Sequence, residues 1–177
     1  MSRISRLLMN RFSAALVVLL TLTAASCEGP PPPVGETLPA PTVALRSEGD
    51  FNLRSRVAMH GYDPVSYWPE GGGVPQMGSE QRAVALGGVI YLFASDQNLA
   101  AFRTDPARYE PAHGGWCSYA MRDGSKVDVD PKTFLLRDGR LFLFYNSGGT
   151  NTLKLWQEGA HEPQLQQADV AWQTAQR

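Results

Sequence analysis

The sequence has little cysteine, no run of basic residues and no long apolar segment. Cysteine occurs only at Cys27 and Cys117, which is too few for the disulfide framework of a small secreted domain. Lysine and arginine are scattered, so nucleic acid and acidic polymers are poor candidate partners. No internal repeat and no nucleotide-binding glycine fingerprint occurs either. These absences argue against a disulfide-stabilised scaffold, a nucleic-acid-binding protein and a nucleotide-binding protein.

Residues 1–26 have the pattern of an export signal. Arg3, Arg6 and Arg11 form a basic start, and a weakly polar to apolar run follows from Phe12 to Ala25. A run of about 14 residues suits a signal-peptide core, because a membrane-spanning helix needs roughly 20. We therefore expect the chain to be exported.

The end of this run, "TAASC", is similar to a bacterial lipobox. The resemblance implies that Cys27 is acylated and becomes the new N-terminus, so that a lipid holds the protein on the periplasmic face of a bacterial membrane. Ala24 and Ser26 are also small enough for general signal peptidase, and the alternative is a soluble periplasmic or secreted protein. An acylated Cys27 would leave Cys117 without a disulfide partner.

A proline-rich linker is predicted for residues 27–50. Four consecutive prolines, at positions 30–33, favour an extended polyproline helix and therefore a semi-rigid stalk. The remaining residues, 51–177, are enough for one domain with one core. Without the three arginines of the signal, the chain has 13 basic and 17 acidic residues and a formal net charge of −4.

The pattern of residues 51–177 predicts an α+β domain in which short helices pack on antiparallel hairpins. Gly87-Gly88 and Asp138-Gly139 each separate two β-rich runs and predict tight hairpin turns. Three Asp-Pro pairs, at positions 63–64, 105–106 and 130–131, have the pattern of helix starts. Further helices are predicted after Ser95, with Leu99, Ala100 and Phe102 toward the core, and in two C-terminal segments. The second of these carries an apolar stripe of Leu165, Ala168 and Trp172.

Motifs spread over residues 57–172 resemble those of bacterial YHS-domain proteins. "AMHGYDPVSYW", "GVIYLFAS", "FRTDPARYEPAHGGWCSYA", "KVDVDP" and "DGRLFLFYN" occur in the order and spacing of that family. The resemblance implies a small α+β fold, exported or lipid-anchored, without a settled activity. YHS domains are similar to the TRASH metal-binding group, but His60, Gly61, Ala94 and Asn98 stand where that group carries cysteine. The metal ligands of that group therefore do not transfer to this chain.

The stretch "HGGWCSYAM", residues 113–121, allows three interpretations of Cys117. In the first, Cys117, His113 and Met121, with His60 from the first motif, form a soft ligand set that suits copper(I) or another soft metal ion. In the second, Cys117 and Met121 pack in the core and His113 lies at a loop end on the surface. In the third, Cys117 is a reactive thiol activated by His113 or Arg122.

The function predicted from these observations is a non-enzymatic accessory or binding protein of the YHS type, attached to the membrane through the lipid. A soft metal ion is one candidate ligand, and a small molecule or a protein partner is another. The alternative is a thiol-based redox protein or enzyme that uses Cys117. Ser95 and Ser118 lack a nucleophile-elbow context, and no histidine–carboxylate arrangement is recognised around them.

Overall fold

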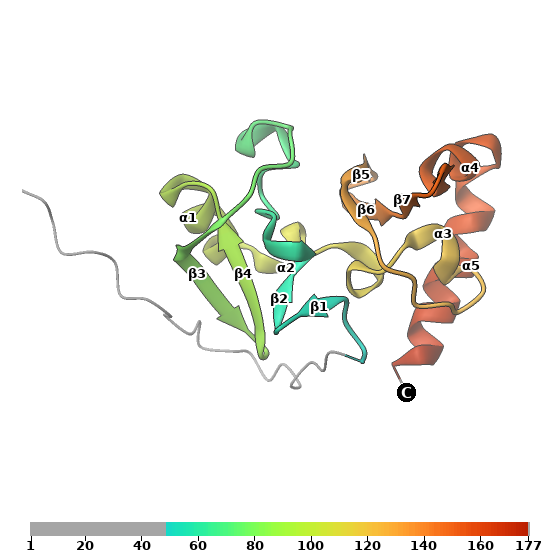
Figure 1. Ribbon diagram of the computed structural model, residues 1–177, viewed down its shortest axis with the longest axis horizontal. Helices are drawn as coiled ribbons and strands as arrows, with labels where there is room; N and C mark the ends of the chain where they lie inside the picture. Colours follow the sequence, from blue (N-terminus) through green and yellow to red (C-terminus); the bar gives the residue numbers. More distant parts are fainter. Residues whose placement is uncertain (1–48, 177) are drawn as a thin grey trace, which may run out of the picture. The chain divides into compact units, whose positions relative to one another are not determined.

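The computed structural model describes residues 49–176, and Figure 1 shows how their helices and strands are arranged. The predicted export signal, Cys27 and almost all of the proline-rich linker lie outside the described residues. The described part is a small α+β unit with antiparallel strands and a few helices, so the predicted fold class is confirmed at that level. None of its helices is long and apolar enough to cross a membrane.

The first sheet has four strands in the order β1-β2-β4-β3. Strands β3 (Ser79–Leu86) and β4 (Val89–Phe93) form the predicted antiparallel hairpin. Gly87 and Gly88 form its turn with φ angles of 56° and 87°, the left-handed conformation that a tight hairpin turn requires. The short strands β1 (Leu53–Arg54) and β2 (Val57–Ala58) extend the sheet, with β2 parallel to β4.

The second hairpin joins β5 (Asp130–Arg137) to β6 (Arg140–Phe144), again as predicted. Its turn residues Asp138 and Gly139 have φ angles of 51° and 70°. The last four residues of β6 are completely buried, so this strand lies at the centre of the C-terminal half. A small hairpin follows, formed by β7 (Asn146–Ser147) and β8 (Thr150–Asn151).

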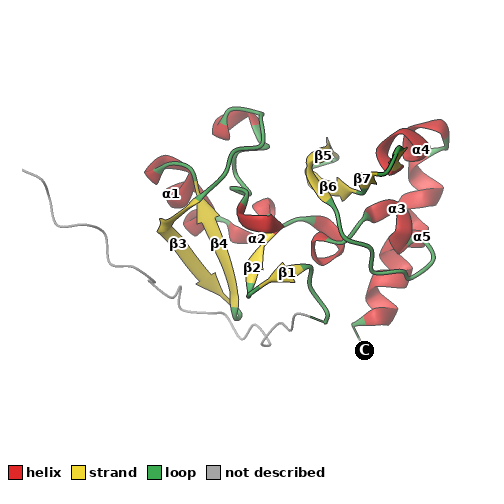
Figure 2. Ribbon diagram, in the orientation of Figure 1, coloured by secondary structure: helices red, strands yellow, loops and turns green. Residues whose placement is uncertain are grey.

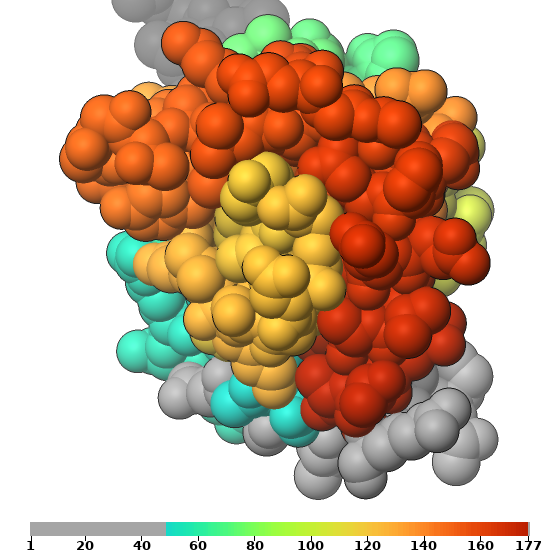
Figure 3. Space-filling model, turned by 90° about the vertical axis from the view of Figure 1, so that its right-hand side faces the viewer, coloured from blue at the N-terminus to red at the C-terminus, as the bar shows by residue number. Residues whose placement is uncertain are grey.

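Short helices surround these strands, as the secondary-structure colouring in Figure 2 makes clear. The α-helices are α1 (Asp96–Thr104), α2 (Pro106–Tyr109), α3 (Ser118–Met121), α4 (Thr152–Glu158) and α5 (His161–Ala175). The 3-10 helices are η1 (Met59–Gly61), η2 (Pro69–Gly71) and η3 (Ala112–Gly115). On the face shown in Figure 3, α3 lies beside α5, and these two helices pack against each other.

The predicted start of α1 is confirmed in detail. The hydroxyl of Ser95 accepts a hydrogen bond from the backbone N–H of Asn98, which satisfies one of the unpaired donors at the helix start. Leu99 and Phe102 are buried as expected. Ala100 is exposed, so its predicted core position is wrong: it lies one residue outside the buried stripe of the helix.

Of the three Asp-Pro pairs, only the one at residues 105–106 starts an α-helix, α2. The pair at 63–64 opens two successive turns, and the pair at 130–131 lies in β5. At Asp130, the carboxylate accepts hydrogen bonds from the N–H of Lys132 and the hydroxyl of Thr133. Those local bonds take the place of a helix cap and allow the chain to stay extended.

Asp63 is completely buried and holds three segments together. Its carboxylate accepts hydrogen bonds from the N–H groups of Val65 and Ala94 and from the side-chain amide of Asn98, at 2.8, 2.8 and 2.6 Å. A buried carboxylate is tolerated only when its oxygens are bonded in this way. Asp63 is therefore a structural link between the turn after η1, the end of β4 and the start of α1.

The first described residues are bonded to a segment far along the chain. The backbone N–H of Asn52 donates to the carbonyl of Gly114, and the side-chain amide of Asn52 donates to the carbonyl of Gly115. The indole of Trp116 donates to the carbonyl of Asp50. These bonds hold the N-terminal edge of the domain against residues 114–116.

Candidate functional site

The Cys117 thiol is sealed inside the domain and has hydrogen-bond partners of its own. Cys117 is completely buried immediately before α3. Its sulfur accepts from the N–H of Tyr145 at 3.4 Å and lies 3.3 Å from the hydroxyl of Thr152. The same hydroxyl lies 3.0 Å from the carbonyl of Tyr145, so Thr152 links the sulfur to the backbone of the residue after β6.

The two groups predicted to activate the thiol have other partners. The guanidinium of Arg122 donates to the carbonyl of Tyr119 and to the side chain of Gln164, and it stacks 3.7 Å from the Tyr119 ring centroid. His113 bonds to Ser118 and Asp169. The partners of the sulfur are the N–H of Tyr145 and the hydroxyl of Thr152, so neither the Arg122 guanidinium nor the His113 imidazole is hydrogen-bonded to it.

His113 is buried with both ring nitrogens engaged, contrary to the expected surface position. Its Nε2 lies 2.9 Å from the carboxylate of Asp169, and its Nδ1 lies 3.0 Å from the hydroxyl of Ser118. A carboxylate only accepts, so Nε2 carries the proton and Nδ1 accepts from Ser118. Burial lowers the pKa of His113 below its usual value, and the hydrogen bond and charge of Asp169 offset this only in part. The imidazole is therefore held neutral.

Asp169 connects His113 to Arg140, the first residue of β6. Its carboxylate takes two parallel hydrogen bonds from the guanidinium of Arg140, at 2.9 and 2.8 Å. Burial alone would raise the pKa of Asp169, but the hydrogen bonds from Arg140 and His113 lower it below its usual value. Arg140, at the start of β6, is thereby fixed in position against α5.

Ser118, His113 and Asp169 have the proton order of a nucleophilic triad, which the sequence did not reveal. The serine donates to the imidazole, and the imidazole donates to the carboxylate. However, Ser118 is completely buried, so a substrate carbonyl has no access to its hydroxyl. The arrangement fixes α3, η3 and α5 to one another.

The two histidines among the predicted metal ligands are bonded to other groups. His60, His113 and Cys117 do not belong to any group of three ligand atoms within 4.8 Å of one another in residues 49–176. Met121 is completely buried with Cys117. Both histidine rings bond to carboxylates, His113 to Asp169 and His60 to Asp128.

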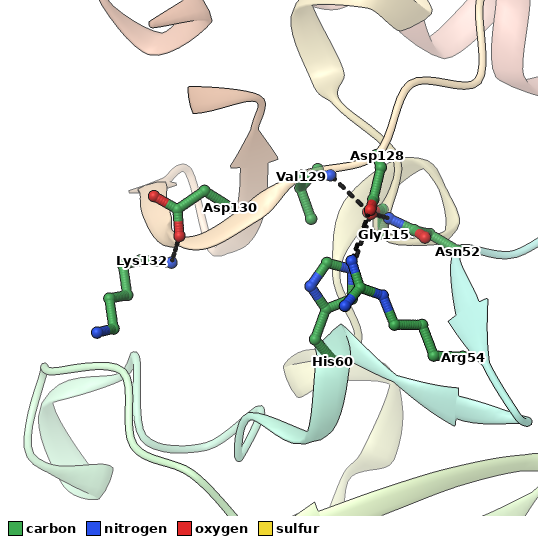
Figure 4. A network of polar contacts seen from close by, with 8 residues as sticks. All are labelled: Asn52, Arg54, His60, Gly115, Asp128, Val129, Asp130 and Lys132. Carbon is green, nitrogen blue, oxygen red and sulfur yellow. Dashed lines mark hydrogen bonds and ion pairs between the residues drawn. The ribbon is translucent and has the colours of Figure 1, made fainter. Parts of the chain in front are cut away.

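His60 belongs to a polar network around Asp128, drawn in Figure 4. Asp128 accepts hydrogen bonds from His60 Nε2 at 2.7 Å, from the side-chain amide of Asn52 at 2.9 Å and from Arg54 at 2.8 Å. The N–H of Val129 is a fourth donor. Burial would raise the pKa of Asp128, but these four hydrogen bonds hold it well below its usual range. The network joins β1 and η1 to the segment before β5.

One cluster within residues 49–176 has the composition of a metal site. Ligand atoms of Asp138, His161 and Glu162 lie within 4.8 Å of one another. The Nδ1 of His161 accepts a hydrogen bond from the indole of Trp156 at 2.9 Å, so the proton of the neutral ring is on Nε2. Nε2 is the nitrogen that faces Asp138, at 3.7 Å, and a protonated nitrogen has no lone pair for a metal. Nε2 is buried and has no hydrogen-bond partner among the described residues.

A cavity of about 320 Å³ lies beside His113. Its walls come from residues 51–53, from Ala58, Met59 and Tyr91, from residues 107–108 and 110–115, from Gly139 and Arg140 at the start of β6, and from Trp172 and Gln176 at the end of α5. This volume is at the lower end of the range for small-molecule sites, roughly 300–1,000 Å³. The described chain therefore has room for a small ligand where its first residues meet η3 and α5.

Glycine is required at one point of the cavity wall. Gly114 has a φ angle of 62°, and a Cβ atom there would lie 2.5 Å from the ring of Trp172 and 3.1 Å from that of Phe51. Those two rings meet edge to face with their centroids 5.6 Å apart. The "HGG" of the sequence thus lets two aromatic rings close against the backbone.

Comparison with known proteins gives no family for the chain. No family model matches the sequence, and no match is found among curated proteins or among solved structures. The function therefore has to be argued from the geometry of the described residues.

Proposed function

We propose that this chain is an exported, lipid-anchored binding protein of the YHS type that holds a small molecule in the cavity beside His113. The observation that carries the proposal is the cavity itself. It combines an aromatic wall, formed by Phe51 and Trp172, with polar side chains such as Arg140 and Asn52. Apolar surfaces with a few fixed polar groups are typical of small-molecule sites.

A non-enzymatic role fits the chemistry of the surrounding groups. His113 is neutral, buried and committed to Ser118 and Asp169, so it is not free to exchange a proton with a ligand. The Cys117 thiol is completely buried and bonded to Thr152. A soft metal ion on Cys117 and His113 would have to break these hydrogen bonds, so a small molecule is the better supported ligand.

The binding proposal is tested by blocking the cavity at its rim. Ala107 is exposed on α2 and lines the cavity, whereas Ala100 is exposed on α1 and does not. Ala107→Trp and Ala100→Trp should both fold, because each adds a ring at the surface of a short helix. A library of small metabolites would be screened by thermal shift and by NMR against both variants. Hits on the unmodified protein should be lost only in Ala107→Trp, and equal binding by the two variants would refute the location.

The proposed membrane attachment is tested at Cys27, which lies outside the described residues. Acylation at this residue predicts that Cys27→Ser moves the protein from the membrane fraction to the soluble fraction. A single acyl chain binds membranes only marginally, so the modified cysteine should carry more than one. Retention of Cys27→Ser entirely in membranes would show that another feature is the anchor.

A further inference from the structure

Two guanidinium groups line the cavity, those of Arg108 and Arg140. Each is paired with a carboxylate, Arg108 with Glu70 and Arg140 with Asp169, and Glu110 also lines the cavity, so the site carries no excess of positive charge. An arginine stays charged at any physiological pH, and its N–H groups only donate hydrogen bonds. The cavity therefore offers fixed, charged N–H donors.

Both arginines are held in place by contacts that leave part of the guanidinium available. Arg140 uses one N–H on each terminal nitrogen for Asp169, and its side chain is 38% exposed. Arg108 donates from one terminal nitrogen to Glu70, lies 4.9 Å from the Trp68 ring centroid and is 47% exposed. A guanidinium has further N–H groups in a planar fork, and a fork that is already fixed loses little entropy when it binds a carboxylate.

The apolar side of the cavity requires that the ligand also has an apolar part. The edge-to-face pair of Phe51 and Trp172 and the ring of Pro111 present carbon surface to the same space. Only a ligand with an apolar body gains from covering such a wall. Inorganic phosphate has no such body and would leave the wall wet.

We infer that the ligand is a small carboxylate with an apolar ring. Its carboxylate takes the remaining N–H groups of Arg140, and its ring lies against Phe51 and Trp172. The inference rests on the proposed function, because it names the chemical class of ligand for the same cavity. The small volume, about 320 Å³, restricts the class to compact molecules.

The test compares three probes of nearly equal shape on the purified full-length protein in detergent. Benzoate carries the charge, benzamide is its neutral counterpart, and benzylamine has the opposite charge. Titrations would be followed by NMR on the resonances of Trp172 and Gly114. We expect benzoate to bind at least about tenfold more tightly than benzamide, because hydrogen bonds between charged groups are stronger than neutral ones. Benzylamine should not bind.

Substitutions test whether Arg140 is the residue that binds the carboxylate of the ligand. Arg140→Gln should reduce benzoate affinity about tenfold or more and leave benzamide nearly unchanged. Arg137→Gln is the matched control, since Arg137 is exposed, pairs with Asp138 and does not line the cavity. If Arg140→Gln does not fold, salt gives the same information: raising the salt concentration should weaken benzoate binding and not benzamide binding.

Each result bears on one claim. Equal or tighter binding of benzamide or benzylamine, with shifts at the cavity, would overturn the inferred ligand class and leave the cavity as a binding site. Benzoate binding that survives Arg140→Gln at low salt would overturn the role of Arg140. The proposed function fails separately, if neither these probes nor any library compound shifts the cavity resonances.

Discussion

Replacing Gly114 with alanine should destabilise the domain by more than the strain of its backbone. An L-residue in the left-handed region costs roughly 1–2 kcal/mol. At Gly114, with φ at 62°, the new methyl group would also lie 2.5 Å from the Trp172 ring, well inside van der Waals contact. The ring must move, and the edge-to-face contact with Phe51, worth about 0.5–1.5 kcal/mol, is lost with it. The expected total is about 1.5–3.5 kcal/mol.

Gly148 provides the matched control. Its φ angle is 58°, and a Cβ atom there would meet nothing within 4 Å. Gly148→Ala should therefore cost only the backbone strain, roughly 1–2 kcal/mol. The difference between the two variants isolates the collision with the cavity wall. Urea unfolding followed by far-UV circular dichroism measures both free energies of unfolding.

A double variant identifies the colliding partner. If Trp172 is the obstacle, Trp172→Leu should make Gly114→Ala less costly, with a coupling free energy of about 1 kcal/mol in a double-mutant cycle. Equal costs for Gly114→Ala and Gly148→Ala would refute the argument that the aromatic wall rests on the Gly114 backbone. The same result would weaken the case for the cavity.

Three further outcomes follow from the buried polar groups. Cys117 should resist maleimide in the native state and react after denaturation, and rapid labelling of the native state would contradict a sealed thiol. Cys117→Ser should lower the free energy of unfolding by about 1–2 kcal/mol, because the shorter hydroxyl reaches Thr152 less well. Stability should fall as the pH drops through 6.5, the ordinary histidine value, because the unfolded chain then binds a proton that the folded His113 resists. His113→Gln, whose amide still donates to Asp169, should flatten urea midpoints measured between pH 7.5 and 5.5, and an unchanged slope would exclude His113 as the source. Ser118 should not react with a fluorophosphonate probe, because its hydroxyl is completely buried. Labelling of Ser118 would show that solvent reaches this hydroxyl and would contradict its burial.

Local features of the fold could be predicted from the sequence. The hairpin turns at Gly87-Gly88 and Asp138-Gly139 were found because a two-residue turn depends on its own φ angles. The cap at Ser95 was found for a similar reason: donor and acceptor are three residues apart. The Asp130-Pro131 pair was misjudged because its extended neighbours pair with β6, and tertiary pairing outweighed a local helix signal.

The candidate site depends on contacts between distant segments, so the sequence alone did not reveal it. His113 and Asp169 are 56 residues apart, and Cys117 and Thr152 are 35 apart. One signal was present: Asp169 follows Leu165 by four residues, so a carboxylate lies close to the predicted apolar stripe of α5. A charged residue at such a position needs a buried partner, and the buried His113 is that partner.

The attachment of the first described residues has a mechanical consequence. The carbonyl of Asp50 and the backbone and amide groups of Asn52 are bonded to residues 114–116, which also form a wall of the cavity. Tension applied to the chain before Gly49 would therefore load the hydrogen bond from Lys126 to the Gly49 carbonyl and then these hydrogen bonds, before it reached the hairpins. A pull of that kind would open the cavity at Gly114 while the four-stranded sheet stayed intact, so that force on the chain before Gly49 and occupancy of the cavity would oppose each other.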